Sequence, residues 1–166
     1  MVSRRANLER ERRLGTFLVE LSRWLLAAPD RELLLRYTLQ SLTTLVDAQG
    51  AYVALRNPDG DSLRVAATVG RSAEMEGLVL PLDASTTGRV VTSGESFMSE
   101  NILLEPDVHR GTSPSGTARA VMITPLRTSS GVAGAVGVVR FVGPEGATPP
   151  AFTLFDLQYV SAVASH

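Results

Sequence analysis

The sequence predicts an α+β domain. Two leucine-rich segments near its start repeat apolar residues at helical spacing, whereas the middle of the chain places apolar residues at every second position. Short turn sequences between these alternating segments predict hairpins, and a further helical segment begins near the end. With 166 residues, the chain is long enough for one domain with a substantial core.

Both helical segments near the start carry an apolar stripe. In the first segment the stripe consists of Leu14, Leu18, Leu21 and Leu25. It covers too few heptads to form a coiled coil alone, so we expect it to pair with another helix. Residues 31–48 repeat the pattern, and Gly50 is expected to end this second helix.

Alternating residues then predict strands and one short helix. Residues 51–70 read as two strands joined by the turn Asn-Pro-Asp-Gly, and 76–83 as a short apolar stretch. A short helix is expected to begin at a cap, Ser85 or Thr86, and to end at Gly94. A short strand follows within 96–101.

The last third contains a long polar connection and a glycine-rich run. Residues 103–118 are rich in Gly and Pro, and connections of that length are usually functional or mobile. The run 129–141 places Gly131, Gly134 and Gly137 three apart. A phosphate-binding loop must open a helix, but this run alternates Ala and Val and leads into a proline-rich stretch. It therefore predicts a strand whose glycines allow close approach of another element.

Composition excludes several classes of function. The chain has no cysteine, which removes disulfides, thiolate catalysis and cysteine-bound metals. It also has no lysine, which removes Schiff-base chemistry and the lysine of a Walker loop. The net charge of −1 gives no case for nucleic-acid binding. Without a signal peptide or an apolar run of about 20 residues, the chain is expected in the cytoplasm.

Four local patterns, in their order along the chain, resemble the GAF family of small-molecule sensory domains. They are LLLRYTLQSLTTLVDAQGAYVALRN, TGRVVTSGESFMSEN, ARAVMITPLRTSSGVAGAVGVVRF and FTLFDLQYVSAVAS. The resemblance implies a central antiparallel sheet of five or six strands. It also implies N- and C-terminal helices packed on one face, with the short helix and the long loop over the other. The domain would span 29–166, preceded by an amphipathic lead-in and dimerisation helix over 1–28.

Known activities of this family can be compared with the residues present. Cyclic-nucleotide-binding members carry Asn-Lys followed by Phe-x3-Asp-Glu; here Phe152 and Asp156 have the right spacing, but Leu157 replaces Glu and no Asn-Lys precedes them. We interpret these residues as a helix N-terminus, with Phe152 in the core. Bilin attachment and sulfoxide reduction in this family need cysteine. His109 lies in the loop that carries the heme ligand of some members, but away from the family position near Ser115, so no cofactor or metal is expected.

The resemblance favours a sensory or regulatory module of a larger bacterial signalling protein. The module itself is not expected to be an enzyme, although the full-length protein could carry a catalytic output domain. A ligand would shift the terminal helices, and these would act on an output domain such as a histidine kinase, a PP2C-like phosphatase or a transcription regulator. The final helix stops with its apolar pattern unfinished, so the native chain is expected to continue beyond His166. A ligand-free module for dimerisation or protein interaction is the alternative.

A ligand is expected between the sheet, the short helix and the loop 103–118. An anionic or hydrogen-bond-accepting group would suit the helix N-terminus and the arginines near it. The candidate ligand-binding residues are Arg89, Asn101, His109, Arg119 and Thr124. Surface ion pairs of Arg89 or Arg119 with Glu95 or Glu100 remain the competing interpretation. A homodimer through the N- and C-terminal helices is also expected.

Overall fold

The computed structural model describes residues 8–16, 18–19, 31–104 and 117–164. It contains three named α-helices, which are α2 (Arg31–Leu45), α3 (Thr86–Ser93) and α4 (Leu154–Ala164). The strands are β1 (Gly50–Arg56), β2 (Ser62–Gly70), β3 (Val79–Pro81), β4 (Phe97–Ser99), β5 (Ala118–Thr128) and β6 (Gly131–Phe141). Three short 3-10 turns complete the order, η1 (Arg71–Met75), η2 (Ile102–Leu104) and η3 (Pro144–Gly146).

The strands form one six-stranded sheet in the order β3-β2-β1-β6-β5-β4. All neighbouring strands pair antiparallel. The two hairpins, β1–β2 and β5–β6, are joined in the centre of the sheet by the pairing of β1 with β6. The α+β class and the antiparallel sheet of five or six strands are confirmed.

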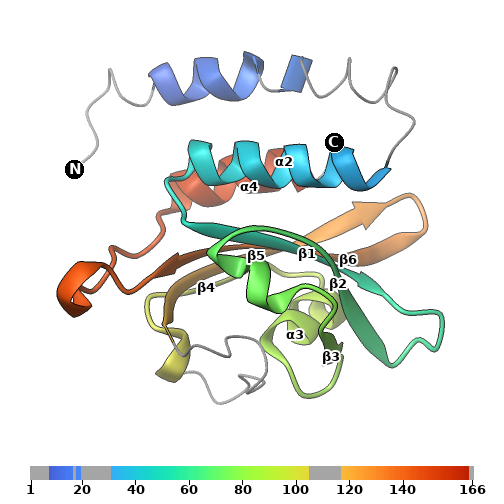
Figure 1. The fold of residues 1–166 in the computed structure, drawn as a ribbon. Helices are drawn as coiled ribbons and strands as arrows, with labels where there is room; N and C mark the ends of the chain where they lie inside the picture. Colours follow the sequence, from blue (N-terminus) through green and yellow to red (C-terminus); the bar gives the residue numbers. More distant parts are fainter. Residues whose placement is uncertain (1–7, 17, 20–30, 105–116, 165–166) are drawn as a thin grey trace.

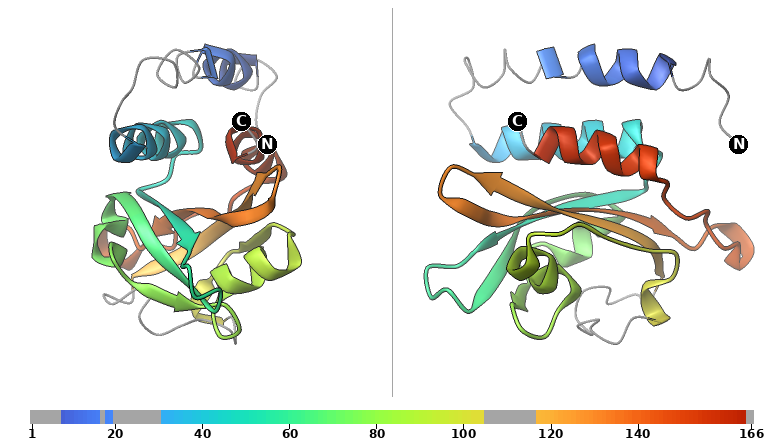
Figure 2. Two further views of the ribbon diagram at one scale, coloured as in Figure 1. Left: turned by 90° about the vertical axis from the view of Figure 1, so that its right-hand side faces the viewer. Right: turned by 180° about the vertical axis from the view of Figure 1, so that it is seen from behind.

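Helices cover the two faces of the sheet in different ways (Figure 1). Helices α2 and α4 lie side by side on one face, whereas α3 lies on the other, and residues 8–16 and 18–19 form a helical layer outside α2 and α4 (Figure 2). Each face has its own buried apolar cluster, one beneath α2 and α4 and one beneath α3. Residues 105–116, most of the predicted long loop, lie outside the described residues.

The apolar stripes of the first two helical segments point into the molecule where they are described. Leu39 and Leu42 of α2, and Val46 just after it, are fully buried. Leu14 and Leu18 pack against the same cluster. Within the chain these two leucines therefore already have partners, while Leu21 and Leu25 lie outside the described residues. No described helix is long and apolar enough to span a membrane.

The glycine-rich run is a strand, as predicted. Gly134 and Gly137 both lie within β6, and a Cβ added at either position would come closer than 3.0 Å to a neighbouring group. At Gly134 that group is the backbone carbonyl of Ala54 on β1. The glycines thus permit close packing, as strand glycines commonly do.

One predicted boundary is wrong. Helix α2 ends at Leu45, and Gly50 is already the first residue of β1. The chain leaves the helix through Asp47, which has a left-handed φ of 53°. The backbone N–H of Ala48 donates to the carbonyl of Thr43 at 2.9 Å, the pairing of a Schellman turn. Aspartate is among the few residues other than glycine that adopt this conformation readily, which explains the earlier stop.

Candidate functional site

Helix α3 is fixed at both ends by the residues that the sequence marks. Ser85 is the N-cap, and its Oγ accepts a hydrogen bond from the Gly88 N–H at 2.9 Å and donates one to the Pro81 carbonyl at 2.6 Å. Gly94 ends the helix with a φ of 73°, and its N–H donates to the Val90 carbonyl. The predicted limits of this helix are confirmed.

The two sides of α3 have different surroundings. At about 100° per residue, Thr87, Val90 and Val91 share one side, and all three are buried against the sheet. The opposite side lines a groove of about 430 Å³, formed by Leu82, Asp83, Ser85, Arg89 and Thr92. A helix N-terminus and a guanidinium favour an acceptor group in this groove, whereas the Asp83 carboxylate opposes a strongly charged anion.

Of the predicted ligand-binding residues, the four that the structure describes do not meet at one point. Arg89 places its guanidinium 5.3 Å from the centroid of the Phe97 ring on β4, a cation–π contact. Asn101 accepts a hydrogen bond from the Leu103 N–H at 3.1 Å, and Arg119 donates one to the Ala118 carbonyl at 2.9 Å.

Asn101 and Arg119 nevertheless lie near the same end of the β4–β5 pair. Ser99 of β4 pairs with Val121 of β5. Asn101 follows Ser99 by two residues and Arg119 precedes Val121 by two, and because the strands are antiparallel, both lie towards the same end. His109 lies outside the described residues.

Thr124 belongs to the other side of the sheet. Side chains alternate between faces along a strand, so Thr124 shares the face of Met122 and Leu126, which pack into the cluster beneath α2 and α4. It is buried, and the Ser96 hydroxyl lies 3.4 Å from its own. A ligand bound on the face of α3 would not reach it directly.

A tyrosine not singled out from the sequence joins α3 to the sheet. Tyr52 of β1 is 2% exposed, and its hydroxyl lies 2.8 Å from Thr87 Oγ1 on the inner side of α3. Burial raises the pKa of Tyr52 to about 12, while the hydrogen bond to Thr87 opposes the rise. The neutral phenol is therefore the form that this site holds.

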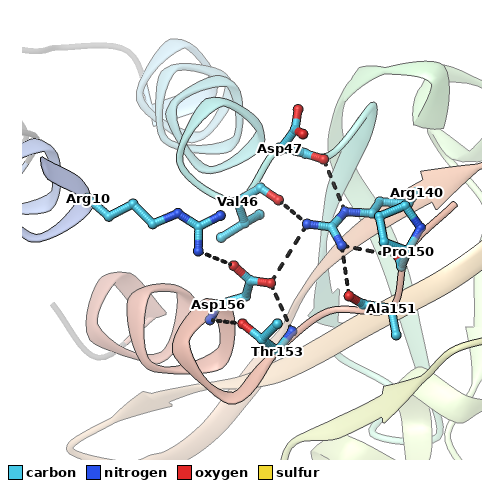
Figure 3. Close-up of polar contacts among 8 residues, drawn as sticks. All are labelled: Arg10, Val46, Asp47, Arg140, Pro150, Ala151, Thr153 and Asp156. Carbon is cyan, nitrogen blue, oxygen red and sulfur yellow. Dashed lines mark hydrogen bonds and ion pairs between the residues drawn. The ribbon is translucent and has the colours of Figure 1, made fainter. Parts of the chain in front are cut away.

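A buried ion pair lies on the opposite face, where β6 meets the terminal helices (Figure 3). Arg140 of β6 is 6% exposed, and Asp156 in the first turn of α4 is 1% exposed. Their closest charged atoms, Arg140 Nη2 and Asp156 Oδ2, are 3.7 Å apart. Arg10 Nη1 contacts the other oxygen, Asp156 Oδ1, at 3.1 Å. One carboxylate thus faces guanidinium groups from β6 and from the N-terminal helical segment.

Arg140 also holds the ends of two chain segments in place. Its guanidinium donates to the carbonyls of Val46 and Asp47, just beyond α2, at 2.6 and 3.1 Å. It donates to those of Pro150 and Ala151, which lead towards α4, at 3.1 and 3.0 Å. Burial lowers the pKa of Arg140, whereas the nearby carboxylates of Asp156 and Asp47 raise it. An arginine inside an otherwise apolar strand was the available signal for this contact.

The start of α4 has the form expected from its sequence. The Thr153 N–H donates to Asp156 Oδ2 at 2.9 Å, and the Asp156 N–H donates to Thr153 Oγ1 at 3.2 Å, which is a capping box. Phe152 is buried, and the Arg140 guanidinium lies 4.1 Å from its ring centroid. The interpretation of Phe152 and Asp156 as a helix N-terminus is confirmed.

Within the part of the chain that the structure describes, neither face shows a metal-binding arrangement. Among the described residues, no three or more His, Asp or Glu side chains gather in a way that could hold a metal ion. On the face of α3 the described groups offer hydrogen bonds and guanidinium charge. On the other face Arg140 and Asp156 are engaged with the backbone and with each other.

Comparison with solved structures shows the same architecture. The GAF domain of a phosphoenolpyruvate-protein phosphotransferase from Coxiella burnetii is 16% identical, with a TM-score of 0.79 over 95% of this chain and 89% of that one. The GAF-B domain of DevS from Mycobacterium smegmatis is 20% identical, with a TM-score of 0.63 over 79% and 85%. Residues 122 to 287 of a methyl-accepting chemotaxis protein are 19% identical, with a TM-score of 0.68 over 87% and 90%.

No curated protein matches this sequence. Comparison with models of protein families, however, agrees with the structural comparison. The GAF domain family matches residues 28–166, which is most of the chain and includes every named helix and strand. The chain therefore belongs to the GAF domain family.

Proposed function

We propose that this GAF domain is a sensory or regulatory module of a larger bacterial signal-transduction protein. It binds a small ligand on the face of α3 and transmits binding through the terminal helices to an output domain. The observation that carries this proposal is the contact set of Arg140, which links β6 to the end of α2 and the start of α4. Similar folds from a phosphotransferase, from DevS and from a chemotaxis protein support a regulatory role.

Strand β6 gives a route from one face to the other. Gly137 lies against Tyr52, which is hydrogen-bonded to α3, while its neighbours Val136 and Val138 belong to the cluster beneath α2 and α4. Adjacent residues of one strand point to opposite faces, and packed interiors transmit small shifts. A displacement of α3 is therefore expected to reach α4 through β6, a two-site coupling of the kind that allostery requires.

The ligand proposed for this face carries an acceptor group. The groove beside Ser85 and Arg89 offers donors. Asn101, His109 and Arg119 are retained as candidate contacts, of which His109 lies outside the described residues. Thr124 stays a candidate only for an indirect effect, since it lies on the other face. Output domains proposed for the full chain are a histidine kinase, a PP2C-like phosphatase or a transcription regulator, and we propose a cytoplasmic location without cofactor or catalytic activity in this segment.

A homodimer through the helical layers completes the proposal. Leu8 and Val19 in the N-terminal helical segment are 58% and 55% exposed, and Leu33 on α2 is also exposed. A groove of about 660 Å³ separates that segment from α2 and is lined by residues of both. The exposed side chains of Leu8, Val19 and Leu33 offer apolar surface to a second copy.

One observation favours the second candidate, a ligand-free dimerisation or interaction module. Tyr52 fills the space beside Gly137, and Gly88 of α3 packs directly on the backbone of Leu82. An α3 face closed in this way needs no ligand for its stability.

Native mass spectrometry of the purified protein, combined with a thermal-shift screen of small anions and metabolites, distinguishes the two candidates. A specific ligand is expected to raise Tm with its concentration, because binding stabilises only the folded state. Arg89→Ala and Arg119→Ala are expected to weaken a hit, whereas Arg64→Ala, an exposed arginine on β2, is the matched control. No bound molecule and no shift would favour the ligand-free module.

Sedimentation tests the dimer separately. The intact chain is expected to sediment as a dimer at micromolar concentration, and a chain lacking residues 1–27 as a monomer. Monomers in both cases would refute the dimer, whatever the ligand screen shows.

A further inference from the structure

The middle of the sheet beneath α3 is occupied by the side chain of Tyr52. In the β1–β6 pair, Tyr52 lies opposite Gly137. A Cβ added at Gly137 would come closer than 3.0 Å to Cε1, Cζ and the hydroxyl oxygen of Tyr52. The outer half of the phenol ring therefore lies across the bare backbone of β6, in space that any other residue at 137 would take.

The surroundings of this ring are apolar except at one end. Tyr52 belongs to the buried cluster beneath α3, which also contains Val90 and Val91 of the helix and Ala135 and Val139 of β6. The hydroxyl lies 2.8 Å from Thr87 Oγ1, and Thr87 is itself 1% exposed. The apolar side chains around the ring, the bare backbone of Gly137 and the single buried hydroxyl of Thr87 match the shape and chemistry of a phenol.

We propose that the space between α3 and the sheet is a binding site for a hydroxylated aromatic ring, and that Tyr52 occupies it as an intramolecular ligand. The inference goes beyond the proposed function: the acceptor group proposed there lies in the groove on the outer side of α3, whereas this site lies on the inner side. It names a further class of molecule for this helix and the residue that controls access. A ligand reaches the site only by displacing Tyr52, which breaks the bond to Thr87 and so removes one of the contacts that hold α3 to the sheet. Free phenols compete poorly with a covalently attached ring, because its effective concentration is high.

Removal of the side chain tests the site directly. Tyr52→Ala is expected to bind p-cresol, which is the tyrosine side chain as a free molecule, with a Tm that rises over millimolar concentrations. Wild type and Tyr52→Phe, in which the ring stays in place, are expected to show no such rise. A p-cresol response of equal size in wild type, or none in Tyr52→Ala, would overturn the proposal.

The hydroxyl partner has its own readout. In Tyr52→Ala, toluene is expected to bind about three- to tenfold more weakly than p-cresol, because one hydrogen bond is lost. Adding Thr87→Val is expected to remove this preference. Equal affinities for toluene and p-cresol in Tyr52→Ala would contradict the role given to Thr87.

Two measurements keep the test informative if Tyr52→Ala folds poorly. Addition of p-cresol is expected to increase its folded fraction, measured by far-UV circular dichroism, since the ligand binds only the native state. Gly137→Ala is expected to lower Tm in wild type but to have little effect when Tyr52 is already alanine, because the clash is with the tyrosine ring. Equal effects of Gly137→Ala in both backgrounds, or no gain of folded protein with p-cresol, would refute the proposal.

The outcome is separable from that of the proposed function. A natural ligand found by mass spectrometry, with no p-cresol binding to Tyr52→Ala, would refute the phenol site and leave the sensory role intact. Binding of p-cresol to Tyr52→Ala, with no ligand for wild type in a screen that includes substituted phenols, would support the site and count against a ligand-sensing role.

Discussion

The contacts of Arg140 make a quantitative prediction about stability. Arg140→Met keeps an unbranched apolar stem near Phe152 but removes the guanidinium that donates to four carbonyls and faces Asp156. Removing one partner of a buried ion pair costs about 3–5 kcal/mol. Arg10 still contacts Asp156, which reduces the loss, while the carbonyls left without a donor increase it. We therefore expect a loss of about 4 kcal/mol.

Urea unfolding followed by circular dichroism measures this loss. For a domain of this length, about 4 kcal/mol corresponds to a Tm lower by roughly 8–16 °C. The matched control is Arg64→Met, which makes the same chemical change at an exposed position of β2 and is expected to stay within about 0.5 kcal/mol of wild type. Arg10→Ala removes only the outer contact of Asp156 and is expected to cost about 1 kcal/mol.

The reasoning fails if the two methionine variants are equally stable. A loss below about 1 kcal/mol for Arg140→Met would mean that water replaces the guanidinium at the carbonyls, so that the contact set does not hold α2 and α4 to the sheet. The proposed route of transmission would then lose its principal support.

Three further predictions concern α3, β6 and Tyr52. Ser85→Ala is expected to cost about 1 kcal/mol in urea unfolding through loss of the N-cap; a cost within error of zero would contradict the capping role. Gly134→Ala is expected to cost about 1–3 kcal/mol or more, because its Cβ would meet the Ala54 carbonyl, whereas Gly15→Ala, with open space around it, should not destabilise; the reverse order would be inconsistent with the packing. Burial raises the pKa of Tyr52 to about 12, whereas a tyrosine in the unfolded chain has a pKa of about 10. The unfolded state therefore releases its proton first as pH rises, so the stability that Tyr52 contributes is fully present below pH 10 and is lost between about pH 10 and 12. Between pH 10 and 12 the free energy of unfolding should therefore fall by up to about 3 kcal/mol more in wild type than in Tyr52→Phe. Parallel curves of this free energy against pH would argue against a buried phenol.

The limits of α3 could be predicted because the signals are local. Ser85 and Gly94 act within one turn of the helix that they bound, so the sequence next to them contains the cause. The end of α2 was misplaced for a similar reason. Gly50 is the more usual helix terminator, but Asp47 takes the left-handed conformation three residues earlier.

The contacts between distant segments could not be predicted in this way. Tyr52 and Thr87 are 35 residues apart, and Arg140 and Val46 are 94 apart, so neither pair leaves a local pattern. The face of the sheet on which the Thr124 side chain lies could not be predicted either. Central strands of this sheet are buried on both sides, so alternation between polar and apolar residues does not show which face a side chain takes.

The pairing of β1 with β6 has a consequence for how the chain folds as it is made. Gly50 pairs with Val139, 89 positions later (139 − 50), so the centre of the sheet cannot close until nearly the whole domain has been synthesised. At about 5–20 residues per second, β1 waits roughly 4–18 s after its own synthesis for this partner. During that time the β1–β2 hairpin has one strand edge unpaired and apolar side chains on both faces. Folding is therefore expected to be slow for a domain of this size, and a nascent chain that ends before β6 should be a substrate for chaperones.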